Sequence, residues 1–407
     1  MARNSYTEVT RKGFGKRFTE SISGAIIGGL MFIAAFPLLW WNEGRAIGEH
    51  QALKEGAGAV VHVAADSVEA VNQGRLLHLS ARVDGAPAID DSKLGVSVDG
   101  LGLRRIVEMY QWQESRHTRE EKKFGGGSET VTEYKYSMDW DDEHVDSSDF
   151  RHPGTHENPT EWPLQSEKFE AQAMTMGAFT LATATRAAVG NWRKLEPQAA
   201  IRFPEAFEAF RHVGGGTLYQ GAGPEQPEVG DLRVRFEFQP EAQFSIVARQ
   251  SGKELDSYTT SNGHSVLLVE SGAVPADKMF EGAQTRNSVI TWVVRAGGTL
   301  SMWLGLSMVF APITRVLDIL PMLGTIGTWG IGLLSGLVSL LLSLLTIGIS
   351  WMFYRPLLGG TLIALVVALF IWSRSRKSPV SSPLATGTLP PPPAPPPAPP
   401  PPAGSPL

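Results

Sequence analysis

The sequence predicts a membrane α-helical bundle of four transmembrane helices joined to a large α+β extramembrane domain with antiparallel sheets. Residues 296–372 hold only three charged side chains in 77 positions, which is longer and more apolar than any element of a soluble core. Residues 22–41 are twenty residues without a charge. A helix needs about 20 apolar residues to cross the hydrocarbon core of a bilayer. Residues 296–372 are therefore long enough for three crossings, and residues 22–41 for one. The polar residues between them alternate in strand-like patterns.

The first crossing is predicted at residues 22–41, behind a basic tail at residues 1–21. The excess of Lys and Arg in this tail places it in the cytoplasm. A cleaved signal peptide also begins with a basic stretch. Its apolar segment is usually shorter, however, and a small-residue cleavage site follows it, which this sequence lacks. Trp40 and Trp41 instead resemble the aromatic belt of a retained membrane anchor.

The other three crossings are predicted at residues 289–313, 322–353 and 357–372. Basic residues also follow the last crossing, so both termini are expected in the cytoplasm, which requires an even number of crossings. Aromatic side chains and long cations suited to the interface lie near the predicted outer ends. These candidate interfacial and lipid contacts are Trp40, Trp41, Arg295, Tyr354 and Arg355.

The last segment, residues 373–407, is rich in Pro and Ala and has few other apolar side chains. Such a composition cannot bury a core and favours extended polyproline conformations. The sequence therefore predicts a disordered cytoplasmic tail.

Residues 42–288 are predicted to form the extramembrane domain, built mainly from antiparallel strand pairs. Six runs have strand-like patterns: residues 76–83, 105–112, 133–140, 231–238, 244–248 and 265–270. A weak internal echo, with Asn-Glu-Gly-Arg at 42–45 and Asn-Gln-Gly-Arg at 72–75, accompanies a looser repeat in strand order. It indicates two related β units, at about residues 70–165 and 220–288.

Charge and cysteine usage exclude several partners and sites. Residues 43–295 carry 26 Lys and Arg against 38 Asp and Glu. A net acidic domain does not suit nucleic acid, because phosphate binding needs positive charge. The absence of cysteine excludes disulfides, thiolate metal sites and cysteine nucleophiles.

The usual catalytic and nucleotide-binding motifs are absent, so we expect no enzymatic activity, no cofactor and no metal. Neither a G-x-S-x-G elbow nor a G-x-x-x-x-G-K-[ST] loop occurs. Two metal hypotheses stand beside the simpler reading of solvated loops. The acidic run at 139–149 could hold Ca²⁺, although its spacing matches no EF-hand. Zn²⁺ could be held by His144, His152, His156 and Glu157, although the intervening Pro-Gly disrupts helical pairing.

The third predicted crossing carries a stripe of hydroxyl residues at spacings of three and four, which places them on one helix face. The stripe consists of Ser335, Ser339, Ser343, Thr346 and Ser350. It can serve as a helix-packing face, because small residues let membrane helices approach closely, or it can line a pore. Packing is favoured, since ion pathways usually carry ionisable residues and the predicted crossings hold no acidic residue within the apolar runs.

Several motifs resemble those of the LUMA family, also called transmembrane protein 43, in the same order from about residue 20 to residue 372. The most specific is L-R-R-x-V-E-M-Y-Q-W-x-E at 103–114, and N-E-G-R-A at 42–46 follows the first crossing. N-x-G-R-L at 72–76, H-x-N-P at 156–159 and F-Y-R-P-L at 353–357 also match. The motif positions taken as candidate sites are Asn42, Glu43, Gly44, Arg45, Arg104, Arg105, Glu108, Tyr110, Trp112, His156 and Pro159.

Within the longest motif, Arg104, Arg105 and Glu108 could recognise an anionic group or form a structural ion pair. Adjacent strand residues face opposite ways, so one arginine is expected to be buried or paired and the other exposed. An ion pair with Glu108 or a neighbouring acidic residue is the expected arrangement.

The resemblance implies four crossings, a large domain on the lumenal side and no enzymatic activity. In animals the family lies in the endoplasmic reticulum and inner nuclear membrane, self-associates and is linked to lamins and emerin, and a cation-channel role has been proposed. The Pro-rich tail departs from the animal pattern, and no N-x-[ST] glycosylation acceptor is present. We therefore expect a bacterial member in the inner membrane with a periplasmic domain. The endoplasmic reticulum or inner nuclear membrane is the alternative.

The expected function is that of a non-enzymatic, self-associating multi-pass membrane scaffold. It would organise or maintain membrane or envelope structure through its extramembrane domain. Its expected partners are membrane lipid, further copies of itself and unidentified membrane or envelope proteins, but not nucleic acid. An oligomeric cation channel or pore is the alternative. An enzyme acting on lipid or envelope polymer near His156 and Glu157 is a third hypothesis.

Overall fold

The computed structural model describes residues 4–123, 127–196, 210–317 and 321–354, with a few isolated positions beyond. The helices are α1 (Phe14–Ala59), α2 (Thr183–Ala188), α3 (Ala276–Val309), α4 (Ala311–Leu317) and α5 (Pro321–Tyr354). The strands are β1 (Ser5–Lys12), β2 (Val61–His62), β3 (Leu76–Ala86), β4 (Ile89–Asp91), β5 (Val96–Val98), β6 (Gly102–Lys122), β7 (Ser128–Asp141), β8 (Glu167–Glu170), β9 (Ala173–Met176), β10 (Phe179–Leu181), β11 (Arg193–Leu195), β12 (Arg211–His212), β13 (Thr217–Gln220), β14 (Leu232–Gln239), β15 (Ala242–Ser251), β16 (Glu254–Asp256), β17 (Tyr258–Thr259), β18 (Ser265–Val266) and β19 (Leu268–Ser271).

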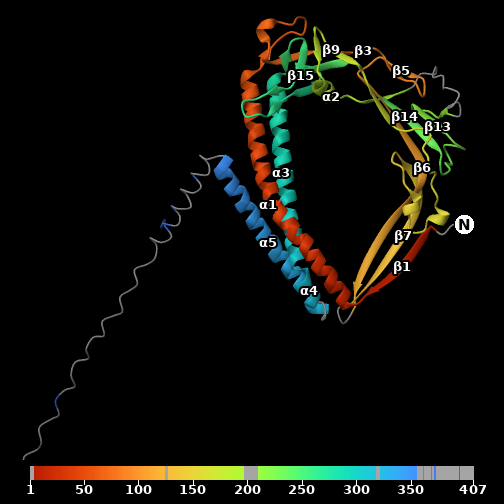
Figure 1. Ribbon diagram of the computed structural model, residues 1–407, viewed down its shortest axis with the longest axis vertical. Coiled ribbons are helices and arrows are strands. Elements are labelled where there is room, and N and C mark those ends of the chain that lie inside the picture. Colours follow the sequence, from red (N-terminus) through yellow and green to blue (C-terminus); the bar gives the residue numbers. More distant parts are fainter. Residues whose placement is uncertain are drawn as a thin grey trace, which may run out of the picture.

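Three long helices form a column on one side of the molecule, with α1 and α3 packed along each other and α5 against both (Figure 1). Each is long and apolar enough to cross a membrane. Their outer faces carry large apolar side chains such as Ile26, 64% exposed, and Leu333, 79% exposed. Small or polar residues such as Gly28 and Ser339 are buried between them. Because apolar burial drives the folding of soluble bundles, this inverted distribution suits an environment of lipid.

The described helices correspond to three of the four predicted crossings. α5 begins and ends within one residue of the predicted 322–353 segment. The fourth predicted crossing at 357–372, the predicted tail at 373–407 and Arg355 lie outside the described residues, apart from isolated positions. The structure thus contains a membrane bundle of three candidate spans and a large, β-rich domain with antiparallel sheets.

α1 and α3 are longer than the crossings predicted at 22–41 and 289–313, because the two helices continue beyond the apolar segments as a packed pair. At this end, buried apolar residues of both helices meet the strand domain in a single cluster. The cluster contains Ala52 and Leu53 of α1, Ala276, Met279, Phe280 and Ala283 of α3, and Leu76, Val247 and Val266 of the strands. Apolar periodicity on the polar side of the membrane therefore extends each helix past its hydrophobic run.

The strand domain consists of two large, mostly antiparallel sheets that share one core. The first follows the order β1-β7-β6-β14-β13-β12, with β8 on β6 and β11 on β14. The second follows the order β19-β15-β16-β10-β9-β3-β2, with β15 also paired to β3. All six runs predicted from the sequence are strands, but β6 continues ten residues past the predicted end at 112 and β7 begins five residues before the predicted start at 133. The run at 265–270 is divided between β18 and β19.

The two sequence units at 70–165 and 220–288 do not form separate sheets. β6 of the first unit pairs antiparallel with β14 of the second, and β3 pairs antiparallel with β15. Each sheet therefore contains a pair that takes one strand from each unit. This intertwining makes the strand domain a single body, since neither unit completes a sheet alone.

Residues 5–12, within the segment predicted to be a basic tail, form the edge strand β1. β1 pairs along its length with β7, from Ser5 opposite Lys135 to Lys12 opposite Ser128. β1, β6 and β7 together make a three-stranded ribbon, whose far end approaches the start of α1. There the buried Arg17 lies 3.4 Å from Glu120 and donates to the Gly127 carbonyl.

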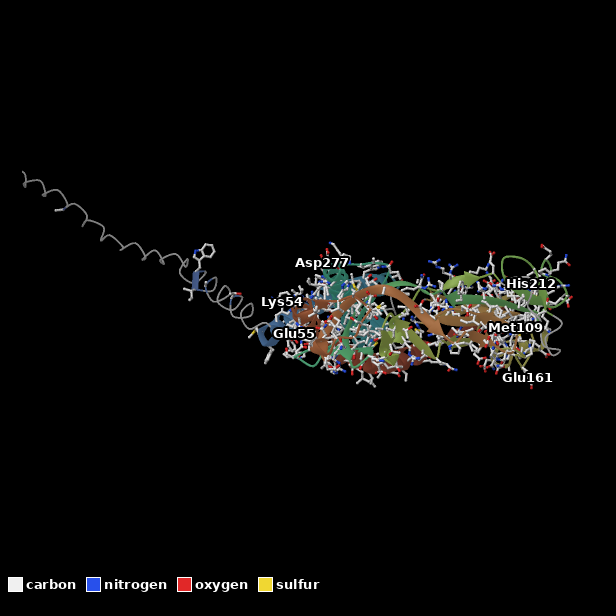
Figure 2. The ribbon with its side chains drawn as sticks, turned by 90° about the horizontal axis from the view of Figure 1, so that it is seen from above. Lys54, Glu55, Met109, Glu161, His212 and Asp277 are labelled. Atoms are coloured by element: carbon white, nitrogen blue, oxygen red, sulfur yellow. The ribbon has the colours of Figure 1, made fainter. Side chains whose placement is uncertain are left out.

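The ribbon meets the helices at one end, and the rest of the strand domain meets them at the other, so the chain closes a flat ring (Figure 1). Seen from above, the molecule is narrow. Lys54, Glu55 and Asp277 lie at its helical side, and Met109, Glu161 and His212 lie at the opposite side (Figure 2). The helices and the ribbon therefore run on opposite sides of the molecule.

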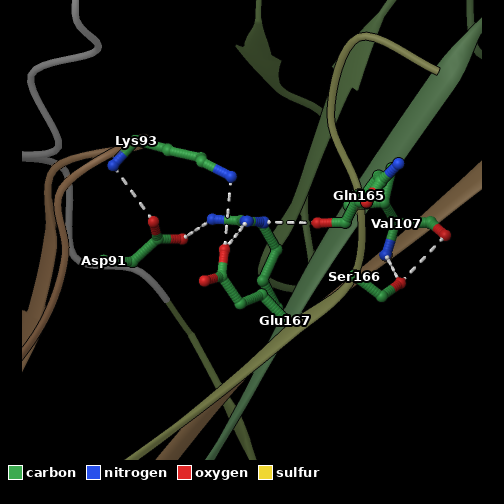
Figure 3. Close-up of polar contacts among 7 residues, drawn as sticks. Asp91, Lys93, Val107, Gln165, Ser166 and Glu167 are labelled. Atoms are coloured by element: carbon green, nitrogen blue, oxygen red, sulfur yellow. Dashed lines mark hydrogen bonds and ion pairs between the residues drawn. The ribbon is translucent and has the colours of Figure 1, made fainter. Parts of the chain in front are cut away.

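A buried cation ties β6, inside the first sheet, to β4 and to the start of β8. Arg105 of β6 is 1% exposed and forms ion pairs with Asp91 and Glu167, while its Nε donates to the Gln165 carbonyl at 3.0 Å (Figure 3). Asp91 is equally buried. Each of the three guanidinium nitrogens thus has an acceptor, and these acceptors come from two segments, one ending at Asp91 and the other holding Gln165 and Glu167.

We predict that Arg105→Met destabilises the strand domain by about 3–5 kcal/mol, because it leaves the Asp91 carboxylate buried without its cation. Thermal unfolding followed by far-UV circular dichroism measures the loss. The control is Arg104→Met, one residue away. Arg104 pairs with Glu237 but has a 40% exposed side chain, so its loss should cost at most about 1 kcal/mol. Equal melting temperatures for the two variants would contradict a structural role for the Arg105 network.

Candidate functional site

A cluster of polar side chains joins the helices just beyond the apolar run of α1. Glu43 of α1 is 1% exposed and accepts two hydrogen bonds of 2.7 Å, from Nε and Nη2 of Arg295 on α3. A bidentate, charge-assisted pair of this kind is among the strongest polar contacts between side chains. Its burial beside the membrane makes the pairing obligatory, since an isolated charge there would be costly.

The neighbouring turn of α1 repeats this attachment to α3 with uncharged partners. Arg45 donates from Nη1 to the Asn287 amide oxygen at 3.0 Å and from Nη2 to the Thr291 hydroxyl at 3.1 Å. Asn42 donates to the Thr291 carbonyl at 3.2 Å, and Asn287 donates to the Ala46 carbonyl at 2.9 Å. Both helices are thereby fixed in register and rotation.

α5 enters the same cluster through Trp351, whose indole Nε1 donates to Glu43 at 2.8 Å. The Arg295 guanidinium lies over the rings of Trp292, at 4.9 Å, and Trp351, at 5.8 Å, in cation–π geometry. Gly44 faces the Tyr354 ring, where an added Cβ would lie 2.8 Å from ring atoms. The polar junction is defined here as Asn42, Glu43, Arg45, Asn287, Thr291, Arg295 and Trp351.

Arg295 is predicted from the sequence to be a snorkelling cation at the outer end of its crossing, and the structure adds a protein partner for it. Its side chain is 16% exposed and is held by Glu43. The sequence contained the necessary signal: Glu43 follows one crossing and Arg295 begins the apolar part of the next. Because successive crossings are antiparallel, these two residues lie at similar depth, and burial of opposite charges requires that they pair.

Two cavities meet at the junction. A polar cavity of about 210 Å³ lies between α1 and α3 and is lined in part by Glu43, His50, Gln284 and Ser288. An apolar groove of about 460 Å³ runs between α3 and α5. Trp292, Arg295 and Trp351 line both, so these three side chains form the boundary between a polar and an apolar space.

The side chains of the other predicted interfacial residues differ in how far they are exposed. Trp41 is 58% exposed, and Tyr354 is 37% exposed. Trp40 packs instead against Phe353, with ring centroids 5.0 Å apart, and against Tyr354. Aromatic rings from α1 and α5 thus gather beside the junction, where an interfacial belt is expected.

The hydroxyl stripe of α5 is buried inside the bundle. Ser335, Ser339, Ser343 and Ser350 are at most 1% exposed, and Thr346 is 9% exposed. α5 contacts α1, α3 and α4, so the stripe faces these helices. Ser343 and Thr346 hydrogen-bond to carbonyls one turn earlier in their own helix. Within the described residues, the stripe therefore lies against neighbouring helices of the bundle.

The structure does not pair Arg104 or Arg105 with Glu108. The glutamate lies on β6 and binds Arg233 and Arg235 of the neighbouring β14 instead. Arg104 pairs with Glu237 on the same neighbouring strand and lies over the Trp192 ring at 4.7 Å. Cross-strand pairing decides these partners, because residues opposite each other on adjacent strands are closer than residues along one strand.

The remaining motif residues lie in the strand domain, where Trp112 contacts His156 and the others have different neighbours. His156 is fully buried, stacks on Tyr136 with centroids 3.9 Å apart and meets the edge of Trp112 at 4.7 Å. The Pro159 carbonyl contacts His144 Nε2 at 2.9 Å. Tyr110 exchanges backbone hydrogen bonds with residues 230 and 231 and packs on Trp140. Burial, together with a hydrogen bond to Glu114, raises the pKa of Tyr136 to about 12, so its hydroxyl stays protonated.

The histidines considered for zinc are separated by these contacts. His144 faces Trp162 and the Pro159 carbonyl, whereas His152 stacks on Tyr6 of β1 and His156 on Tyr136. Across the described parts of the chain, no group of three or more His, Asp and Glu side chains is placed to hold a metal ion.

The sequence model of the family described as Transmembrane protein 43 matches residues 109–356, a stretch that contains both ends of the α3–α5 groove. The chain belongs to the transmembrane protein 43 family. It is 31% identical to Transmembrane protein 43 of Rattus norvegicus, over 92% of this chain and 96% of the relative. The human protein is 30% identical over 90% and 93%, and the Drosophila melanogaster homologue is 29% identical over 86% and 93%. No solved structure matches this member of the family.

We predict that Glu43→Gln lowers the stability of the helix column by about 3 kcal/mol, the lower end of the range for breaking a buried ion pair, because Arg295 keeps a little solvent access. Adding Arg295→Met to this variant should recover part of the loss, since no unpaired charge remains. Thermal unfolding in detergent micelles measures both effects.

The matched control is Glu281→Gln on α3, which removes a carboxylate that has a 67% exposed side chain and pairs with Lys278 one turn away. This change should cost less than about 1 kcal/mol. If Glu43→Gln and Glu281→Gln had the same melting temperature, the polar junction would not be what holds the helices together.

Proposed function

We propose that this chain is a non-enzymatic, self-associating membrane scaffold that organises or maintains membrane or envelope structure through its strand domain. The supporting observation is that α1 and α3 continue from the apolar belt into the strand domain without a linker. The polar junction locks the two helices at the membrane boundary. The apolar cluster around Phe280 then joins them to the sheets. A domain held at both levels cannot swing freely and suits the presentation of a fixed surface.

The proposed setting is a bacterial inner membrane with both termini in the cytoplasm and the strand domain mainly in the periplasm. The endoplasmic reticulum or inner nuclear membrane is the alternative. The proposed partners are lipid, further copies of this chain and membrane or envelope proteins, without nucleic acid. The net acidic charge of residues 43–295 supports the last point, because it opposes binding to phosphates.

The first test is the mass of the full chain extracted into native-lipid nanodiscs, measured by mass photometry. We expect discrete species above the mass of one chain plus disc, with the same distribution after tenfold dilution. Empty discs from the same preparation serve as the control. A single species at the mass of one chain would contradict self-association.

A pore-forming oligomer is the second candidate, and the polar ribbon favours it. β6 has 21 residues and is about 70 Å long, and α1 has 46 residues and is about 70 Å long, so both exceed the hydrocarbon core. If α1 crosses the membrane, part of the ribbon lies at the same height. Residues 115–121 of β6 are exposed and include five charged or histidine side chains, which cannot face lipid. In an oligomer whose helices face the lipid and whose ribbons face a common centre, the ribbons would be in contact with water.

Labelling of single cysteines tests this candidate, because the native chain has none. In sealed liposomes, His117→Cys on the ribbon should react with a membrane-impermeant maleimide, and the modification should reduce ion flux. Leu333→Cys, on the lipid-facing side of α5, should remain unlabelled because hydrocarbon excludes the charged reagent. Absence of flux above that of protein-free liposomes would reject the pore.

A further inference from the structure

The groove between α3 and α5 has the dimensions of one lipid leaflet. From Trp292 to Trp303 it extends eleven residues along α3, about 16 Å, which is about half the thickness of the hydrocarbon core. Its walls include Leu300 on one side and Leu340 and Leu344 on the other, all about half exposed. These side chains are not covered by any other described segment, so a hydrocarbon chain is the natural filling inside a membrane.

The deep end of the groove is shaped by a glycine. Trp303 lies against α5 and donates from Nε1 to the Gly332 carbonyl at 2.7 Å. A Cβ on Gly336 would lie 3.2 Å from the same indole nitrogen, so the missing side chain lets the ring settle into place. The groove therefore has a fixed floor and end wall, unlike a transient gap between two sliding helices.

The shallow end of the groove opens to the polar cavity through Arg295. Only two of the five N–H donors of a guanidinium are engaged by Glu43, through Nε and Nη2. His50 and Ser288 line the adjoining cavity of about 210 Å³. A polar chamber with a guanidinium at its base, set directly above an apolar slot, matches an amphiphile with an acidic head. Phosphate suits this arginine best, because the fork of donors fits its oxygens.

We propose that the α3–α5 groove and the adjoining polar cavity bind one glycerophospholipid per chain. One acyl chain lies along Leu300, Leu340 and Leu344, and the phosphate lies at Arg295 beside Trp292 and Trp351. The lipid wedges between α3 and α5 and thereby completes the packing of the three-helix column. Because Arg295 also binds Glu43, the lipid phosphate and the polar junction share one cation. Lipid binding and helix packing are therefore coupled.

The test uses the full chain, delipidated in detergent and titrated with dioleoyl phosphatidylglycerol, and native mass spectrometry counts the bound lipids. Ala296→Phe fills the groove from an exposed position in its wall. Val293→Phe adds the same ring to the exposed surface of α3 outside the groove and is the matched control. Dioleoylglycerol, which has the same chains and no phosphate, tests the head site.

We expect one saturable phospholipid adduct on the native chain and on Val293→Phe. Affinity should fall at least about tenfold in Ala296→Phe, the factor that loss of about two buried CH₂ groups produces. Dioleoylglycerol should also bind at least about tenfold more weakly than the phospholipid, since Arg295 gains no charge-assisted bonds from it. Equal binding by the two phenylalanine variants would mean unspecific surrounding lipid and would overturn the proposal.

Two further results would also overturn it. Equal affinity for dioleoylglycerol and for the phospholipid would mean that the site does not recognise the phosphate. Absence of any adduct on the native chain would mean that another occupant, either residues 357–372 or a second copy, fills the groove. A shift in oligomer mass of Ala296→Phe, with Val293→Phe unchanged, would identify the second copy.

Discussion

The ion pair between Glu43 and Arg295 constrains the rest of the structure. Both charges lie where α1 and α3 leave the apolar belt, and neither can be stable there without the other. Satisfying them sets the depth and rotation of α1 against α3, and Trp351 adds α5 to the same point. Once this level is fixed, the helix ends beyond it are also fixed, and they carry the cluster on which the second sheet rests.

The helices pack differently within the membrane belt and beyond the polar junction. Within the membrane belt, small residues approach closely: an added Cβ on Gly28 would collide with the Gly305 carbonyl, and one on Gly305 would collide with the backbone of α1. Lipid offers no hydrophobic drive for helix association, so close backbone contact and polar bonds must hold the helices together. Beyond the junction, Leu53 and Phe280 bury apolar surface from water in the ordinary way.

The closed arrangement of the chain has consequences for the environment of the strand domain. The first sheet begins with β1, which leads directly into α1, and extends through β7 and β6 to β14, β13 and β12. A flat, continuous bilayer cannot border the charged ribbon, because hydrocarbon excludes both its ions and its unpaired backbone edge. The ribbon therefore needs water beside it wherever the chain lies in its membrane.

By itself, the sequence determined the membrane class of the protein, three of its helices to within their apolar cores, and the strands of the large domain. Each of these follows from local periodicity and composition, as in residues 105–112 or 322–353. Family membership was likewise evident from contiguous motifs such as residues 103–114.

Only the tertiary structure decided which charges meet. Arg105 pairs with Asp91, Glu108 with Arg233, and Arg295 with Glu43, although nearer partners exist along the chain for several of them. The same holds for β1, whose partner strand begins more than a hundred residues later. Such pairings depend on which segments the fold places side by side. Opposite charges attract over a few ångströms of space regardless of their separation in sequence, so local patterns cannot identify the partner.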